Sequence, residues 1–496
     1  MTIPLQLDPH ALAAELSNKN LIGGELVPAS SGKTFDVINP ATMETIATTP
    51  FSDATDVDRA VQNAKTAQKA WAKMNARDRG KLVAACGTAL MERVEEMGRL
   101  IALETGKAIR TESRPEASVL ADVFIYFGGL ASELKGESIP FNNETLTVTV
   151  RQPIGVIGAI IPWNAPLLLM ALKIAPALVA GNSVVVKSAE EAPLGVLRVA
   201  QVMNEILPPG VFNILSGFGP EAGAPLVEHK SVGKVSFTGS VDTGRIVYKT
   251  AAERIVPCTL ELGGKSPMIV MADADLDRAV AGALTSMRFT RQGQSCTAAS
   301  RIFVHEDLHD AFVEKMVAAV NAMKMGDPMD EETDIGSVIS PQQFQTVQKY
   351  IGIGKDTAGA TAHVCSALPT DARFSKGLFV QPVIFTGTRN TDQINQEEIF
   401  GPVTCVIPWR DYEDVIAQAN DTQFGLAASV WTNNLKLAMD AVHRIEAGFC
   451  QVNQNVVVQA GLSYGGVKTS GLGKEASLES MLEHFTQKKT IIINMT

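Results

Sequence analysis

The chain has 496 residues, 46% of them hydrophobic, which is more than one core comfortably holds, so we expect two large domains. Its formal net charge of -10 at pH 7, with acidic and basic residues interspersed, argues against a nucleic-acid partner. No apolar run approaches the roughly 20 residues that span a bilayer, so we expect no membrane segment.

Cysteine and histidine spacing argues against two further kinds of site. The six cysteines form no C-x-x-C pair and the seven histidines form no H-E-x-x-H motif, which disfavours a disulfide framework and a zinc site. We therefore expect no catalytic metal. The first residues, MTIPLQLDPHALAAEL, lack the residue order of a secretory signal, and we expect a cytoplasmic protein.

The first part of the chain, to about residue 135, predicts short strands followed by covering helices. Apolar residues recur at helical spacing over 53–74 and again over 77–106. Asp53 is placed to cap the first of these helices, and Gly106 lies near the end of the last.

Residues 143–153 predict a projecting strand, because Leu146, Val148 and Val150 alternate with polar residues. The last residues, FTQKKTIIINMT, predict a second, β-branched strand. Each strand has an edge that a soluble monomer needs to hide, so we expect the two to pair, within one subunit or across to another. A homodimer or a homotetramer is expected.

From Gly155 onward, buried strands alternate with helices. Apolar β-rich runs at 155–162, 183–187, 211–215 and 234–239 are separated by helix signals. This pattern predicts a parallel α/β sheet whose ligand lies beyond the carboxyl ends of the strands. The alternation resumes after a break and continues to about residue 470, so we expect a second α/β domain.

Polar residues follow three of these runs. Asn164 can donate a hydrogen bond into the crevice, although asparagine is also an ordinary turn residue. Lys187 and Glu190 can hydrogen-bond the hydroxyls of a ribose, although an acid in a first helical turn also favours the helix dipole by itself. Gly239 and Ser240 lie between a strand and a helix, where free N–H groups can meet a phosphate.

Two residues are candidates for covalent chemistry. Glu261, in LELGGK, places a carboxylate beside a bare backbone, which suits a general base, although a capping or salt-bridged glutamate is the alternative. Cys296, in RQGQSCTAASR, stands among small and polar residues rather than large apolar ones. That setting favours a nucleophile over a packed structural thiol.

The order and spacing of these segments resemble the aldehyde dehydrogenase superfamily, of the NAD(P)-dependent, non-acylating type, over nearly the whole chain. The resemblance implies an α/β fold with a Rossmann-like parallel-sheet cofactor domain at 1–134 and 155–264. It also implies a second α/β domain, the catalytic one, at 265–475, and a small β oligomerisation element formed by 135–154 and 480–496.

The resemblance assigns roles to residues by motif. Cys296 would be the nucleophile, Glu261 the general base and Asn164 the oxyanion-stabilising amide, with Lys173 and Glu475 around the base and its proton path. The expected cofactor contacts are Ile161, Pro162, Trp163, Lys187, Ser188, Glu190, Gly219, Gly223, Phe237, Thr238, Gly239, Ser240, Leu262, Gly263, Glu398 and Phe400. The expected substrate-tunnel residues are Ala165, Leu169, Leu172, Thr290, Ser295, Thr297, Val458 and Tyr464.

The implied reaction oxidises an aldehyde to the carboxylic acid through a thioester on Cys296, which a water activated by Glu261 resolves. NAD is the expected cofactor and NADP the less favoured one, because the Glu190 carboxylate would repel a 2′-phosphate.

Departures from the commonest family pattern bear on the substrate. Ala165, Leu172 and Val458 stand where relatives often carry aromatic residues, which predicts a wide, aliphatic tunnel and an aromatic or medium-chain aldehyde. Thr290 occupies the position, six before the cysteine, where an arginine would hold the carboxylate of a semialdehyde. A carboxylate-bearing substrate is therefore not favoured, and a semialdehyde or an amino aldehyde is the alternative.

Two functions of other classes stay open. A cysteine hydrolase using Cys296 and Glu261 without a redox cofactor would normally need a histidine partner, and it would leave the ribose contacts without a role. A non-catalytic structural member of the family should have lost Cys296, Glu261 or Asn164, and all three are present.

Overall fold

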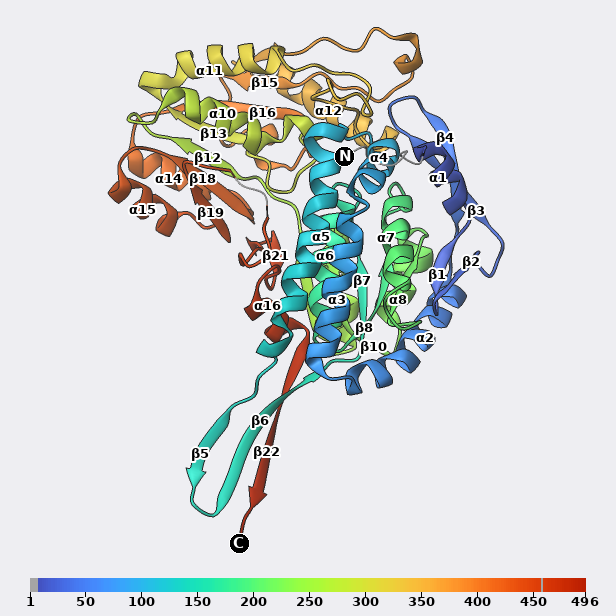
Figure 1. The fold of residues 1–496 in the computed structure, drawn as a ribbon. Helices are drawn as coiled ribbons and strands as arrows, with labels where there is room; N and C mark the ends of the chain where they lie inside the picture. The colour runs from blue at the N-terminus through green and yellow to red at the C-terminus, as the bar shows by residue number, and fades with distance from the viewer. Residues whose placement is uncertain (1–7, 456–457) are drawn as a thin grey trace.

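The computed structural model describes residues 8–455 and 458–496, which form two large α/β halves and a projecting arm of three strands. Figure 1 shows one half above the other, with the arm extending from the lower half and carrying the C-terminus at its tip.

The lower half is built on an eight-stranded sheet. In spatial order its strands are β2 (Glu25–Val27), β1 (Asn20–Ile22), β9 (Phe212–Leu215), β8 (Ser183–Lys187), β7 (Val156–Ile160), β10 (Val232–Thr238), β11 (Cys258–Glu261) and β21 (Gly471–Leu472). The strands from β9 to β11 are parallel, and the chain order switches sides between β7 and β10. Ligands of such sheets bind at the carboxyl ends of the strands beside this switch.

Both faces of this sheet are buried, as near-continuous apolar strands require. In β8, Val184 and Val186 face one core and Val185 faces the other. The helices of this half are α1 (Pro9–Leu16), α2 (Ala54–Lys73), α3 (Ala76–Met91), α4 (Val94–Thr105), α5 (Arg114–Gly129), α6 (Pro166–Val179), α7 (Leu194–Asn204), α8 (Ala224–Glu228) and α9 (Val241–Glu253). As expected, the Asp53 side chain caps α2, and Gly106 ends α4 in the left-handed conformation.

The upper half has a seven-stranded sheet in which all strands but the edge strand β14 are parallel. In spatial order the strands are β14 (Thr361–Val364), β15 (Val383–Thr386), β16 (Val403–Trp409), β13 (Arg301–His305), β12 (Pro267–Val270), β18 (Ala427–Trp431) and β19 (Phe449–Val452). Its helices are α10 (Leu276–Met287), α11 (Glu306–Asn321), α12 (Pro341–Asp356), α13 (Gln393–Gln396), α14 (Tyr412–Asn420) and α15 (Leu435–Arg444).

The arm consists of β5 (Ser138–Asn142), β6 (Thr145–Pro153) and β22 (Thr486–Asn494), with β6 in the middle. β22 pairs antiparallel with β6 along its whole length, and Ile491 lies opposite Val148. The pairing of the two predicted strands therefore lies within one subunit. The outer edge of β22 has no strand beside it among the described residues.

The remaining elements connect these parts. They are β3 (Thr34–Asn39), β4 (Glu44–Pro50), β17 (Phe424–Gly425), β20 (Val467–Lys468) and α16 (Leu478–His484). Within residues 8–455 and 458–496, no helix is both long enough and apolar enough to cross a membrane.

Candidate active site

A cavity of about 310 Å³ lies at the carboxyl ends of β7, β10 and β11, beside the switch in strand order. We call it the strand-end cavity. Its lining residues are Pro162, Trp163, Asn164, Thr238, Gly239, Ser240, Glu261, Leu262, Gly263, Cys296, Gln343, Thr346, Glu398, Ile399 and Phe400. Most of these residues end or closely follow a strand of the lower sheet, because the chain leaves each strand at this edge.

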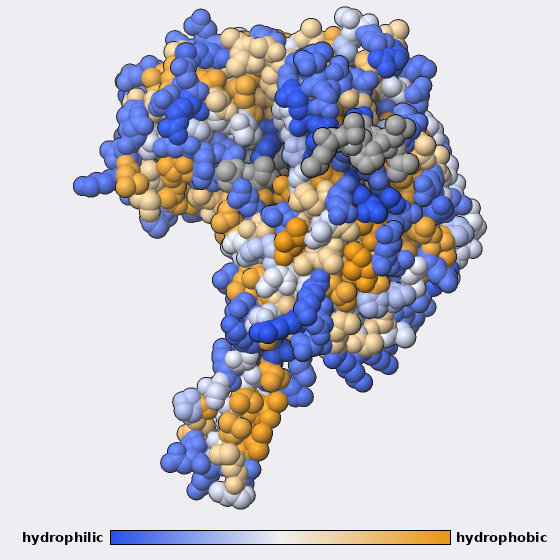
Figure 2. All heavy atoms as spheres, in the orientation of Figure 1, coloured by the Kyte–Doolittle hydropathy of each residue, from blue (hydrophilic) through white to orange (hydrophobic). Residues whose placement is uncertain are grey.

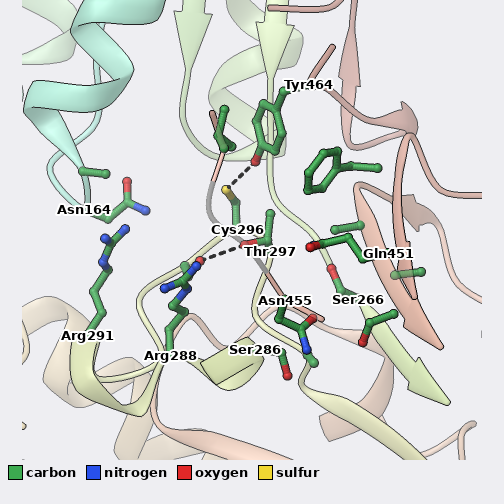
Figure 3. A pocket seen from close by; sticks show the side chains of 18 of the residues that line it. Asn164, Ser266, Ser286, Arg288, Arg291, Cys296, Thr297, Gln451, Asn455 and Tyr464 are labelled. Atoms are coloured by element: carbon green, nitrogen blue, oxygen red, sulfur yellow. Dashed lines mark hydrogen bonds between the residues drawn. The ribbon is translucent and has the colours of Figure 1, made fainter. Parts of the chain in front are cut away.

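A second cavity begins at the first turn of α6, and we call it the α6 cavity (Figure 3). Its free volume is about 60 Å³, room for roughly five water molecules. Its apolar lining consists of Ala165, Leu168, Leu169, Pro267, Ala299, Ala427, Ala428, Phe449, Val458 and Tyr464. Its polar lining consists of Asn164, Ser266, Ser286, Arg288, Arg291, Ser295, Cys296, Thr297, Ser429, Gln451 and Asn455. The lining therefore combines apolar and polar side chains, whereas the sequence predicts an aliphatic tunnel.

Among the described residues, only Cys296 and Asn164 line both cavities. The Asn164 amide nitrogen donates to the Gln294 carbonyl oxygen at 3.2 Å, which holds this side chain against the loop that carries the thiol. A Cβ on Gly264 would lie 2.3 Å from the Cys296 carbonyl oxygen, so only glycine allows the loop to approach this closely. The thiol and the amide thus stand at one point between the cavities.

The Cys296 thiol is half-buried and contacts one hydroxyl group. Its sulfur lies 3.3 Å from the Tyr464 hydroxyl oxygen (Figure 3). Burial raises the pKa of Cys296 to about 11, and the Tyr464 hydrogen bond opposes part of that rise. Tyr464 therefore favours the thiolate, the form of cysteine that attacks a carbonyl carbon.

The Glu261 carboxyl group ends β11 on the wall of the strand-end cavity and is 4% exposed. Its Oε2 atom has no hydrogen-bond partner among the described residues. Burial and then the neighbouring Glu475 raise the pKa of Glu261 well above its usual range. A carboxyl group of raised pKa, open to a cavity and without a partner, has the properties of a general base.

Lys173 and Glu475 form a buried ion pair behind Glu261. The Lys173 Nζ atom lies 2.6 Å from Glu475 Oε1, although the two residues are 302 positions apart in the chain. Glu475 also exchanges two backbone hydrogen bonds with Tyr464, at 2.7 and 3.0 Å. This short bridge connects the segment around the base to the segment that contacts the thiol.

The strand-end cavity has the features that a dinucleotide needs. Lys187 Nζ contacts Glu190 Oε2 at 2.9 Å at the end of β8, where a ribose could accept and donate hydrogen bonds. Ser240 lines the cavity and caps α9, so the N-terminus of that helix lies beside the cavity, a position that favours a phosphate. The Thr238 hydroxyl is buried without a partner among the described residues, and a Cβ on Gly263 would clash with the Glu398 carboxylate.

The structure separates the predicted cofactor residues into two groups. Those on the cavity wall are Pro162, Trp163, Thr238, Gly239, Ser240, Leu262, Gly263, Glu398 and Phe400. Those outside its lining are Ile161, Lys187, Ser188, Glu190, Gly219, Gly223 and Phe237. Trp163 and Phe400 pack edge to face across the cavity with ring centroids 5.3 Å apart.

Two predicted tunnel residues lie off the α6 cavity wall. Leu172 is 1% exposed and packs in the core, because it lies a turn deeper in α6 than Leu169. The Thr290 hydroxyl donates to Glu112 instead. Ala165, Leu169, Ser295, Thr297, Val458 and Tyr464 all line the cavity.

Several lining residues were not predicted from the sequence. In the strand-end cavity these are Gln343, Thr346 and Ile399, and in the α6 cavity the principal ones are Ser266, Arg288, Arg291, Phe449, Gln451 and Asn455. Arg291 opens the segment RQGQSCTAASR, although the sequence gives it no role there. The others come from separate elements that only the fold brings together. Among the described residues, no group of three or more His, Cys, Asp or Glu side chains could hold a metal ion.

Comparisons with known proteins identify the family. Residues 26–491 match the aldehyde dehydrogenase family. The chain is 38% identical over 482 residues to the protein DhaS of Bacillus subtilis, covering 97% of this chain and 96% of that one. An aldehyde dehydrogenase from Bacillus cereus, solved with NAD+, is 37% identical over 100% of both chains, with a TM-score of 0.94. Betaine aldehyde dehydrogenase from Staphylococcus aureus, also solved with NAD+, is 36% identical over 98% of this chain and 97% of that one, with a TM-score of 0.94.

The family match spans nearly the whole chain, and its range contains Cys296, Asn164 and Glu261. This protein belongs to the aldehyde dehydrogenase family.

Proposed function

We propose that this protein oxidises an aldehyde with NAD+ to the carboxylic acid, through a thioester on Cys296. One observation carries the proposal: Cys296 and Asn164 line both cavities, so an aldehyde in one can meet a cofactor in the other at the thiol. NAD+ in the relatives from Bacillus cereus and Staphylococcus aureus supports this choice of cofactor.

The first step is addition of the Cys296 thiolate to the aldehyde carbon, which places a negative charge on the former carbonyl oxygen. The Asn164 amide is positioned to donate to that oxygen, and the Cys296 backbone N–H makes no hydrogen bond to a described residue and can donate as well. Donors held in place before the reaction stabilise such a charge without reorganisation.

NAD+, when bound in the strand-end cavity, would supply the hydride acceptor needed to convert this adduct into a thioester. Glu398 and Phe400 stand on that side of the strand-end cavity, and the Glu398 carboxylate accepts from the Gly264 N–H at 3.0 Å. Burial raises the pKa of Glu398 to about 7.

Hydrolysis of the thioester requires a base, and Glu261 is the candidate. It takes a proton from water, and the Lys173–Glu475 pair behind it offers a buried route by which that proton leaves. Because the pKa of Glu261 is raised, the active carboxylate form becomes more populated as the pH rises.

Glu190 supports NAD+ over NADP+. Its carboxylate pairs with Lys187 and would lie close to a 2′-phosphate, where like charges repel in a partly desolvated groove. Lys187 offsets part of this repulsion, so we expect a preference in affinity rather than exclusion.

The α6 cavity supports an aldehyde with an apolar body, either aromatic or medium-chain. Leu168, Leu169 and Phe449 surround the space next to Cys296, and apolar walls favour apolar ligands by about 25 cal/mol per Å² buried. Room for about five waters suits one small ring or a short methylene chain. Acetaldehyde would leave most of this surface uncovered.

The exposed surface of the arm is evidence for a homodimer or a homotetramer. Its apolar residues include Ile492 at 64% exposure and Phe141 at 73%, and Figure 2 shows apolar residues along the arm. A soluble protein needs to cover such a surface and the free edge of β22, and a second subunit would cover both. Light scattering at micromolar concentration tests this proposal, and a monomer contradicts it.

The decisive test is NADH formation from a panel of aldehydes with each cofactor. We expect benzaldehyde and medium-chain aldehydes to give a higher kcat/KM than acetaldehyde, and NAD+ a higher kcat/KM than NADP+. Ala165→Phe should reduce the advantage of the larger aldehydes. Acetaldehyde as the best substrate contradicts the apolar-body proposal, and no NADH with any aldehyde contradicts the oxidation itself.

A further inference from the structure

Arg288 occupies an unusual backbone position at the end of α10. It is the residue directly after the helix and has φ 56° and ψ 46°, in the left-handed region. Helices often end in this conformation, but with glycine or asparagine, because a larger side chain is strained there. A non-glycine residue held in this region at a ligand cavity is a reason to look for a functional role.

The left-handed turn directs the Arg288 side chain into the α6 cavity. Figure 3 shows it extending from the loop below toward Cys296 and Thr297. Arg288 and Cys296 line the same cavity, so a molecule attached to the thiol has this guanidinium within the same small space.

Arg288 differs from the other cavity arginine in its charge balance. Arg291 donates to Glu112 through Nε at 2.8 Å and Nη2 at 2.6 Å, and the nearby Lys107 is paired with Glu116. Across residues 8–455 and 458–496, the Arg288 side chain makes neither a hydrogen bond nor an ion pair. Glu112 attracts Arg288 at longer range, but Arg291 already balances its charge. Arg288, Arg291, Lys107, Glu112 and Glu116 together therefore carry one positive charge without a paired carboxylate. That charge is on Arg288, which lines the cavity.

A partly buried guanidinium without a partner is unfavourable, because its five N–H donors have lost water without gaining acceptors. The cavity has a second polar group of this kind, the Ser266 hydroxyl, which is 3% exposed and has no hydrogen-bond partner among the described residues. Apolar residues such as Leu169 and Phe449 lie on the same walls. A ligand with an apolar body and an anionic end would satisfy all of these groups.

We propose that Arg288 binds a carboxylate group of the substrate, so that this enzyme prefers aldehydes that carry a carboxylate at the end opposite the aldehyde. A carboxylate matches the planar fork of a guanidinium in shape and charge. The proposal rests on the oxidation proposed above and narrows its substrate class to oxo acids with a ring or a short methylene chain between the two ends. Cationic aldehydes are repelled by the same charge.

Matched pairs of aldehydes test the proposal. The acid 4-formylbenzoate is compared with its methyl ester, and 6-oxohexanoate with hexanal, by initial rates of NADH formation. Wild-type enzyme should give a kcat/KM roughly 10-fold or more higher for each acid than for its neutral partner. Arg288→Gln should lower that acid-to-neutral ratio by about 10-fold to 100-fold, since a hydrogen bond to a charged group contributes that much. The loss of kcat/KM for the acids in Arg288→Gln should appear mainly as a higher KM.

Two further variants sharpen the result. Arg278→Gln makes the same chemical change on an exposed position of α10 and should leave the ratio as in wild type. Arg288→Lys keeps the charge but loses the fork, so its ratio should fall between those of wild type and Arg288→Gln.

The outcomes separate the two proposals. The role of Arg288 is overturned if wild-type enzyme gives equal kcat/KM for the acids and their neutral partners. It is also overturned if Arg288→Gln lowers kcat/KM equally for both. If that variant fails to fold, competition in wild type decides: benzene-1,4-dicarboxylate should inhibit hexanal oxidation, and the uncharged diamide should not. Inhibition by neither, or by both alike, overturns the role. Absence of NADH with every aldehyde overturns the oxidation and this inference with it.

Discussion

The two cavities that meet at Cys296 are built in different ways. The strand-end cavity takes its walls from residues such as Asn164, Gly239 and Glu261, each of which lies at or just beyond the end of a parallel strand of one sheet. The α6 cavity takes its walls from the first turn of α6, the end of α10, the start of β12 and the segment around β18 and β19. A site made from strand ends follows from topology, whereas a site made from scattered side chains depends on how separate elements pack.

The electrostatics of the two cavities differ as well. The strand-end cavity contains carboxyl groups whose pKa values are raised by burial, Glu261 and Glu398. The α6 cavity contains two arginines and no carboxyl group among its described lining residues. We infer that the first cavity handles protons and the second positions the substrate, and the variants below test that division.

Cys296→Ala removes the residue common to both cavities and has the largest expected effect. Oxidation should fall by roughly 1,000-fold or more, because no other cysteine among the described residues lines either cavity. NAD+ affinity, measured by calorimetry, should change little, because Lys187 and Ser240 lie elsewhere. Cys450→Ala removes another half-buried thiol and should retain activity. More than a few per cent of wild-type activity in Cys296→Ala would contradict the assignment.

Glu261→Gln alters the strand-end cavity alone and should slow only the hydrolysis step. Loss of a general base costs about 100-fold to 10,000-fold in that step, so a burst of NADH should be followed by slow turnover. Mass spectrometry should detect an acyl group on Cys296. The exposed Glu253→Gln serves as the control. If Glu261→Gln gives neither the burst nor the adduct, another residue must be the base.

Tyr464→Phe alters the α6 side of the thiol and has the smallest expected effect. The Tyr464 hydrogen bond lowers the pKa of Cys296 from the high value that burial imposes, so removing the hydroxyl should raise that pKa further. The rate at which iodoacetamide alkylates Cys296 rises with pH as the thiolate forms, and in the variant this rise should occur at higher pH. At a fixed pH below the pKa, the variant should react roughly 10-fold more slowly than wild type. Tyr248→Phe, on α9, makes the same change on an exposed residue. An alkylation rate equal to or above that of wild type would refute the role of Tyr464.

Local patterns predict the elements of this fold well. Asp53 and Gly106 bound helices where the sequence indicates, and the apolar runs from 155 to 239 form the parallel strands β7 to β10. Capping and periodicity depend on residues only a few positions apart, so they can be recognised without knowing the fold. The sequence predicts that β22 pairs with β6 but leaves open whether the two strands belong to one subunit or to two. Strand complementarity alone does not distinguish these cases, and the structure places both strands in one subunit.

The sequence alone determined which residues are the catalytic candidates, because Cys296, Glu261 and Asn164 each stand in a short motif whose neighbours already predict a role. Only the tertiary structure decided that Lys173 meets Glu475, that Leu172 lies in the core and that Arg288 faces the thiol. The physical reason is one of distance along the chain. A left-handed turn at Arg288 and an ion pair across 302 residues are held by packing between elements, and no local pattern encodes that packing.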